Sequence, residues 1–193
     1  MTNWCPKHSA PCFDVRCDEC PHRLTIVPRK LLTYRPKVFL DMDGVLANFD
    51  KRAEEILSTN NIYKYEFVHG PEVFWHKLNK YPNFFMELEL MPDAGVLLNA
   101  VWHLDPIVLT ALPKTNGDRV RQHKEAWVAL NLKEGMKVIC CQTHEKPHHC
   151  NPGDVLIDDR AVNRQAWEAK GGRYIVHTSA EDSVAQLKEL KVI

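Results

Sequence analysis

The sequence predicts an α/β fold, in which helices flank a central parallel sheet and a small helical cap is inserted after the first strand. Three observations support this prediction. Short apolar runs alternate with helical patterns through the second half of the chain, an earlier apolar run ends in acidic residues and a glycine, and the stretch after that run breaks the alternation. Apolar strands that alternate with helices are typical of a parallel sheet covered on both faces.

Composition and charge exclude several classes of protein. The 193-residue chain has 45% hydrophobic and 26% charged residues and a formal net charge of zero, which argues against a nonspecific nucleic-acid or anionic-membrane binder. Its N-terminus lacks the pattern of a secretory signal, and no apolar run approaches membrane-spanning length. We therefore expect a cytoplasmic protein without membrane contact, whose seven cysteines stay reduced.

Residues 1–32 are rich in cysteine and histidine and poor in large apolar residues. Because such a segment cannot build a hydrophobic core, we expect a structural zinc ion to hold it together. The expected ligands are four cysteines, with either of two histidines as an alternate for one of them: Cys5, Cys12, Cys17 and Cys20, with His8 or His22. The alternatives are an iron–sulfur cluster and a loosely packed tail with incidental cysteines.

The predicted core covers residues 37–47 and 92–193. We expect strands at five apolar runs, which are residues 38–40, 106–111, 137–141, 154–159 and 173–177. Apolar residues at helical spacing predict four helices, at residues 94–104, 118–130, 160–170 and 181–190. Open α/β sheets hold their active sites at the carboxyl ends of such strands.

Residues 48–91 are interpreted as the cap. They combine a helical stretch at 51–57 with a part that is rich in aromatic residues. Most of these rings should form the cap's own core, because large rings are the usual core residues. One or two are expected to stack on a planar ligand, and the candidates are Phe49, close to the end of the first strand, and Trp75.

The first predicted strand runs directly into Asp41-Met42-Asp43-Gly44. Side chains alternate along a strand, so Asp41 and Asp43 should project from the same face at its carboxyl end. Two carboxylates this close repel each other unless a cation or a proton lies between them. This pair permits phosphoryl transfer, in which one aspartate attacks phosphorus, the other moves protons and Mg²⁺ neutralises the assembly. The alternative is an acidic turn without chemistry.

Polar residues at the ends of the other strands complete the same chemistry. The Thr110 hydroxyl and the Ala111 backbone N–H can hold a phosphate oxygen, and Lys146 can offset phosphoryl charge. Asp158 and Asp159 add carboxylates to the oxygen shell that Mg²⁺ requires. Each residue alone has an ordinary structural explanation, but together, in this order, they favour a phosphatase site.

With these residues the chain resembles the haloacid dehalogenase (HAD) superfamily, and within it the 5′(3′)-deoxyribonucleotidase family. The similar stretches run from Lys37 to the C-terminus: DMDGVLANF, LTALP, EKPHHCNPGDVLIDDR and Lys124-x2-Trp127-Val128. The resemblance implies a Rossmann-like core with a small helical cap whose aromatic residues stack on the base. The cysteine-rich N-terminal segment has no counterpart in the family pattern.

The resemblance also implies a role for each matching residue. Asp41 would be the nucleophile and Asp43 the general acid/base. Four residues would bind Mg²⁺: Asp41, the backbone carbonyl of Asp43, Asp158 and Asp159. Three residues would hold the phosphate or assist near it: Thr110, Lys146 and Lys124.

Two departures from the family pattern concern the site: the first removes a hydroxyl near the phosphate, and the second weakens a cationic contact and leaves the preferred nucleotide open. Ala111 stands where the family has serine, and His144-Glu145-Lys146 stands where it has Arg-x-Lys. The expected function is Mg²⁺-dependent hydrolysis of nucleoside monophosphates through an aspartyl-phosphate. Alternatives are a phosphatase for a nucleic-acid 3′ end or a small phosphorylated metabolite, and a zinc-ribbon recruitment module on a phosphatase fold. The expected partner is a small phosphomonoester, with nucleic acid less favoured and the oligomeric state, including a dimer, left open.

Overall fold

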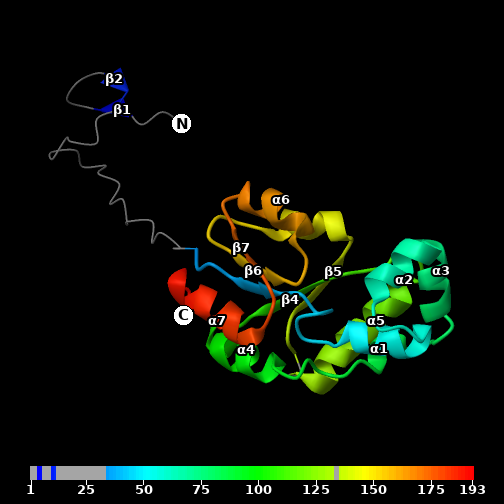
Figure 1. Ribbon diagram of the computed structural model, residues 1–193. Coiled ribbons are helices and arrows are strands. Elements are labelled where there is room, and N and C mark those ends of the chain that lie inside the picture. Colours follow the sequence, from blue (N-terminus) through cyan, green and yellow to red (C-terminus); the bar gives the residue numbers. More distant parts are fainter. Residues whose placement is uncertain (1–3, 6–9, 12–33, 133–134) are drawn as a thin grey trace. The chain divides into compact units, whose positions relative to one another are not determined.

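The computed structural model describes residues 4–5, 10–11, 34–132 and 135–193 (Figure 1). The chain divides into two compact units, Met1–Arg35 and Pro36–Ile193. In the first unit, β1 (Trp4–Cys5) and β2 (Ala10–Pro11) pair in antiparallel fashion. The second unit contains all of the elements predicted for the core and the cap.

Five parallel strands form the central sheet of the second unit, in the order β5-β4-β3-β6-β7. Their bounds are β3 (Val38–Leu40), β4 (Ile107–Ala111), β5 (Val138–Cys141), β6 (Val155–Asp158) and β7 (Arg173–Val176). These bounds agree with the five predicted apolar runs to within one residue at each end. The predicted α/β fold with a parallel sheet is confirmed.

The two faces of the sheet bury alternate residues of each strand, because successive side chains point to opposite sides. Val38 and Leu40 pack into the larger cluster, whereas Phe39 packs edge-on against Trp167 on the other face. Figure 1 shows α6 on one side of the sheet and α4 and α7 on the other. The helices around the sheet are α4 (Ala94–Val101), α5 (Gly117–Asn131), α6 (Arg164–Glu168) and α7 (Ala180–Glu189).

Two of the predicted helices are longer than those observed. The pattern over 94–104 continues beyond α4 as a 3-10 turn, η2 (Trp102–Leu104). The predicted helix over 160–170 begins at residue 164, after the 3-10 turn η4 (Ala161–Asn163). Arg160 itself is extended, with φ −118° and ψ 137°, and its carbonyl accepts a hydrogen bond from the Tyr174 hydroxyl at 2.6 Å. That contact holds Arg160 outside the helix.

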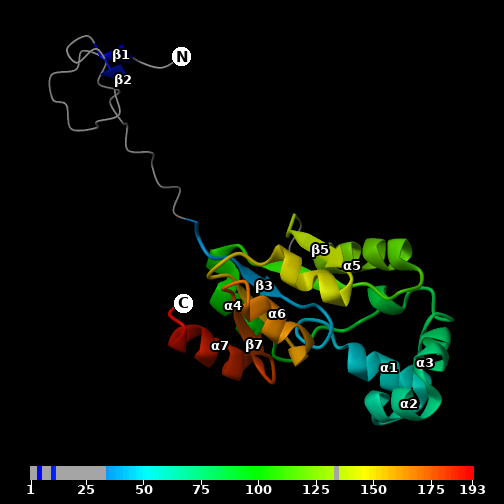
Figure 2. The same ribbon diagram turned by 90° about the horizontal axis from the view of Figure 1, so that it is seen from above.

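Four short helical elements between β3 and α4 form the cap: α1 (Phe49–Leu57), α2 (Ile62–His69), α3 (Pro71–Leu78) and the 3-10 turn η1 (Phe84–Met86). Figures 1 and 2 both place α1, α2 and α3 together at one end of the sheet. The side chains of Asn48 and Asn61 accept hydrogen bonds from backbone N–H groups in the first turns of α1 and α2, which fixes where those helices begin. None of the helices in the described part of the chain has the length and apolar character that crossing a bilayer requires.

Aromatic rings hold the cap together. The Phe49 ring lies 5.2 Å from the Phe84 ring, 6.1 Å from the Trp75 ring and 6.2 Å from the Phe85 ring, measured between centroids. Such edge-on and tilted pairs are favourable beyond the area they bury. Because Phe84 and Phe85 are buried while Phe49 and Trp75 are partly exposed, the latter two are available at a surface.

Candidate active site

A tightly folded loop presents the two aspartates at the end of β3. The Asp41 N–H donates to the Ile157 carbonyl at 2.8 Å, so the pairing with β6 extends one residue past the strand. The N–H groups of Leu46 and Ala47 both donate to the Met42 carbonyl, at 2.9 and 2.8 Å. Met42 and Leu46 are completely buried, so the loop that carries Asp41 and Asp43 is anchored in the core.

Asp41 belongs to a buried charged cluster with Lys146 and Asp158. Lys146 lies in the 3-10 helix η3 (Thr143–His149) after β5, and its Nζ is 2.7 Å from Asp41 Oδ2 and 2.7 Å from Asp158 Oδ2. Burial alone would lower the pKa of Lys146, but the two carboxylates raise it above its ordinary value. Asp41 Oδ1 accepts from the Met42 N–H at 2.7 Å, so the orientation of its carboxylate is fixed.

Asp159 adds a third carboxylate that Lys146 does not contact. Asp41, Asp158 and Asp159 each offer an oxygen, and these atoms lie within 4.8 Å of one another. Burial raises the pKa of Asp159 to about 7, and the charges of Asp41 and Asp158 add to this effect. Three carboxylates with one ammonium leave surplus negative charge, and oxygen ligands are those that Mg²⁺ prefers. The donor set therefore fits a divalent hard cation.

The Asp43 carboxylate accepts a hydrogen bond from Lys124, a completely buried lysine of α5. The Lys124 Nζ lies 2.6 Å from Asp43 Oδ2, 2.7 Å from Thr110 Oγ1 and 2.9 Å from the Ala111 carbonyl oxygen. An ammonium has three donors, and these contacts use all of them. A direct phosphate contact by Lys124, which the resemblance implies, would need one of these bonds to break.

The second oxygen of Asp43 is differently placed. Asp43 Oδ1 is buried and has no hydrogen-bond partner among the described residues. A buried polar atom without a partner is costly and is commonly found at functional sites. Asp43 also lines the cavity described below, so its unpaired oxygen lies at the edge of a space that can hold a ligand.

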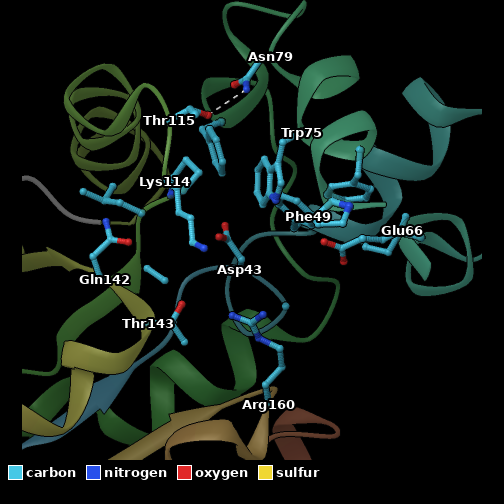
Figure 3. A pocket seen from close by; sticks show the side chains of 18 of the residues that line it. Asp43, Phe49, Glu66, Trp75, Asn79, Lys114, Thr115, Gln142, Thr143 and Arg160 are labelled. Atoms are coloured by element: carbon cyan, nitrogen blue, oxygen red, sulfur yellow. Dashed lines mark hydrogen bonds between the residues drawn. The ribbon is translucent and has the colours of Figure 1, made fainter. Parts of the chain in front are cut away.

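The cavity above these groups has a volume of about 920 Å³ and lies between the cap and the carboxyl ends of the strands. Six residues predicted for the site line it: Asp41, Asp43, Phe49, Trp75, Ala111 and Asp159. Four others are buried behind its wall: Thr110, Lys124, Lys146 and Asp158. Figure 3 shows Asp43 near the centre, with Phe49 and Trp75 on the cap side. The sheet edge thus brings together the residues that the motifs predicted.

Several lining residues were missed by the sequence reasoning. Lys114 and Thr115 follow β4, Arg160 follows Asp159, and Glu66 comes from α2. Arg160 ends a recognised motif and Lys114 directly follows one, which was a usable signal, whereas nothing in the sequence distinguishes Glu66 from a surface residue. A hydrogen bond of 3.3 Å from Asn79 Nδ2 to Thr115 Oγ1 joins the cap to the core across the mouth of the site (Figure 3).

The predicted zinc site falls outside the described residues, except for the backbone of Cys5. Its other candidate ligands are Cys12, Cys17, Cys20, His8 and His22. Among the described residues, the group of carboxylates Asp41, Asp158 and Asp159 has the spacing of a metal site. The structural zinc stays a prediction.

Gly44 gives a direct test of the carboxylate cluster. Its φ is +77°, and a Cβ at this position would lie 2.8 Å from both Cγ and Oδ2 of Asp159. We therefore expect Gly44→Ala to displace Asp159 and to weaken Mg²⁺ binding at least about tenfold, as measured by calorimetric titration.

The matched control is Gly70→Ala. Gly70 also has a positive φ, of +82°, but a Cβ there meets nothing within 4 Å. It should lose stability through the same backbone strain while keeping wild-type Mg²⁺ affinity. Equal Mg²⁺ affinity in the two variants would show that Asp159 is not a ligand.

Comparisons with known proteins identify the family to which this sequence is similar. Residues 35–186 match the family model described as 5′ nucleotidase, deoxy (pyrimidine), cytosolic type C protein. A protein of Vibrio phage KVP40, named provisionally as a 5′(3′)-deoxyribonucleotidase, is 28% identical over 143 residues, which cover 71% of this chain and 74% of the phage protein.

One solved structure of low sequence identity shows the same fold. A HAD family hydrolase from Deinococcus radiodurans R1, solved with bound phosphate and sodium, has a TM-score of 0.51 and 14% identity, and the alignment covers 83% of this chain and 99% of that one. A hydrolase from Streptococcus pneumoniae TIGR4 has a TM-score of 0.49 and 15% identity, with coverage of 83% and 100%.

Proposed function

Since this chain belongs to the family of 5′ nucleotidase, deoxy (pyrimidine), cytosolic type C proteins and is therefore a phosphoric monoester hydrolase, we propose that it hydrolyses nucleoside monophosphates through an aspartyl-phosphate on Asp41. One observation carries the proposal: Asp41 and Asp43 line a cavity whose cap side is lined by aromatic residues. The charged cluster suits phosphoryl transfer, and the partly exposed rings of Phe49 and Trp75 suit a planar base.

In the first step, an Asp41 oxygen attacks phosphorus, and the bond from phosphorus to the nucleoside oxygen breaks. Lys146 and the Met42 N–H hold the Asp41 carboxylate in one orientation, which supports attack from a fixed position. The leaving oxygen takes a proton from Asp43. Because Asp43 Oδ2 is bonded to Lys124, the proton is best carried on Oδ1, the oxygen without a partner.

In the second step, water attacks the phosphorus of the aspartyl-phosphate and gives its proton to Asp43. The bond between phosphorus and Asp41 then breaks, which releases phosphate and restores the carboxylate. Lys124 also bonds Thr110 Oγ1, so the general acid/base and the predicted phosphate ligand share one anchor.

Asp41, Asp158, Asp159 and the Asp43 carbonyl would hold Mg²⁺ in this proposal. The ion would supply charge neutralisation between the carboxylates and the incoming phosphate. The crowding of three carboxylates within 4.8 Å supports this assignment.

Phosphate release from a panel of substrates tests the proposal. The panel consists of deoxy- and ribonucleoside 5′- and 3′-monophosphates, a 3′-phosphorylated oligonucleotide and p-nitrophenyl phosphate, each assayed with Mg²⁺ and then with EDTA. We expect Mg²⁺-dependent release from mononucleotides and none after chelation. Release only from the oligonucleotide would favour the nucleic-acid 3′-end alternative. Release only from p-nitrophenyl phosphate would contradict a nucleotidase and favour another small phosphorylated substrate.

A further inference from the structure

The cap side of the cavity contains a carboxylate that the proposed chemistry does not use. Glu66 lies on α2, on the same helix face as Ile62 and Tyr63, and all three line the cavity. The side chain is half-buried, and within the described residues its carboxylate makes no hydrogen bond or ion pair. It is therefore an acceptor available to a ligand.

The neighbouring acidic residues are less suited to that role. Asp50 is hydrogen-bonded to Tyr63, and burial raises the pKa of that phenol to about 12, with a further contribution from Asp50. Glu72 also lines the cavity but is exposed, so water competes for its oxygens. Glu66 is the half-buried carboxylate on this wall whose oxygens are not engaged by other described side chains.

Glu66 lies on the cap side of the cavity, beyond Phe49 as seen from Asp43 (Figure 3). Figure 3 shows Asp43, Phe49 and Glu66 in that order across the pocket. A nucleotide whose phosphate lies at Asp43 and whose base lies against Phe49 would turn the outer edge of that base toward Glu66. A carboxylate there accepts hydrogen bonds from the donors on that edge and is repelled by its acceptors.

The five common bases differ in what they offer to a carboxylate. Guanine presents two parallel donors, N1–H and the 2-amino group, which can bond both carboxylate oxygens. Cytosine and adenine present an amino group. Thymine and uracil present a single N–H between two carbonyl oxygens, and these oxygens repel the carboxylate. A site built around one charged acceptor therefore discriminates by the donors of the base.

We propose that Glu66 makes this site selective for nucleotides whose base carries an exocyclic amino group, with guanine preferred. This inference rests on the proposed nucleotidase function. It assigns a specificity residue on the cap, where the family motifs give none for this chain.

The test compares kcat/KM for dGMP, dCMP, dTMP and dUMP in three proteins, with p-nitrophenyl phosphate as a substrate that lacks a base. The proteins are the wild type, Glu66→Gln and Glu54→Gln. Glu54 is the matched control, because it is a half-buried glutamate on the neighbouring helix α1 that does not line the cavity.

We expect the wild type to favour dGMP over dTMP at least about tenfold, since a hydrogen bond to a charged group is worth that much or more. Glu66→Gln should reduce kcat/KM for dGMP about tenfold, raise kcat/KM for dTMP because the repulsion from its carbonyl oxygens is lost, and leave p-nitrophenyl phosphate near its wild-type value. Glu54→Gln should keep the wild-type ratio. Glu66→Lys should reverse the preference, because an ammonium donates to the carbonyl oxygens of thymine and uracil.

Two results would overturn the inference while leaving the nucleotidase function in place. One is a dGMP to dTMP ratio that Glu66→Gln does not change, and the other is a wild-type preference for thymine or uracil. Hydrolysis of p-nitrophenyl phosphate with no hydrolysis of any nucleotide would instead contradict the proposed function itself.

Discussion

Replacing Asp41 with asparagine should reduce kcat at least about 10³-fold, because the amide cannot attack phosphorus and no second nucleophile can take its place. The variant should remain folded. Asparagine has nearly the same shape and can still accept the Met42 N–H, while Lys146 keeps its contact with Asp158. Phosphate release measured with saturating Mg²⁺ and the preferred nucleotide gives kcat directly.

Asp118→Asn controls for the loss of one carboxylate. Asp118 is exposed at the start of α5 and does not line the cavity. The kcat of the Asp118→Asn variant should therefore equal that of the wild type. If Asp41→Asn kept more than about a tenth of the wild-type kcat, Asp41 would not be the nucleophile.

Replacing Lys146 with methionine should destabilise the protein by about 3–5 kcal/mol, because it leaves Asp41 and Asp158 buried without their counter-charge. The free energy of unfolding, measured by denaturant titration in EDTA, tests this. Adding Mg²⁺ should restore part of the loss, since a divalent cation between the carboxylates takes over the neutralisation.

Lys51→Met is the matched control. The Lys51 Nζ lies 2.7 Å from Glu89 Oε2, the same separation as in the buried cluster, but both side chains are about half-exposed or more, at 49% and 66%. Water screens such a pair, so this variant should lose much less stability than Lys146→Met. Similar losses in the two lysine variants would contradict a burial-dependent role for Lys146.

The effect of Lys146→Met should also depend on pH, in a direction that the pKa shifts define. Burial and the charge of Asp41 raise the pKa of Asp158, and Lys146 opposes that rise. Without Lys146 the pKa of Asp158 should rise further. The folded variant then binds a proton on Asp158 at a pH where the unfolded chain does not. Protonation then favours the folded state, and the stability gap to the wild type should narrow as pH falls.

The strands and the acidic motif could be predicted because they depend on local patterns. The strands β3 and β6 are buried on both faces, so they appear in the sequence as nearly uninterrupted apolar runs. Asp41 and Asp158 stand where such runs end, and parallel strands bring those ends to one edge. Both residues could therefore be placed together without knowing which strands are neighbours.

The interior of the site could not be predicted in the same way. A lysine within a helical pattern is usually exposed, yet Lys124 is completely buried. Its burial depends on three acceptors from two other segments of the chain, Asp43, Thr110 and the Ala111 carbonyl. Contacts of this kind are set by tertiary structure and leave no periodic signal in the sequence.

The cap was the least predictable part. Ile62 is the one buried residue of helix α2. The α2 sequence therefore has no apolar stripe that would predict a helix or the face that meets the core. The pocket side of α2 includes Tyr63 and Glu66, which in sequence look like ordinary surface residues. The specificity residue proposed above therefore emerged from the structure and not from the motifs.

A burst experiment with Asp43→Asn tests the central claim most directly. Nitrophenolate leaves without a proton from a general acid, so this variant should still transfer the phosphoryl group of p-nitrophenyl phosphate to Asp41. It should then stall, because nothing accepts the proton of the attacking water. We predict a rapid release of about one nitrophenolate per active site and, after acid quenching, a phosphorylated peptide that contains Asp41. Steady release without a burst, with an unmodified Asp41, would contradict the account and indicate direct attack by water.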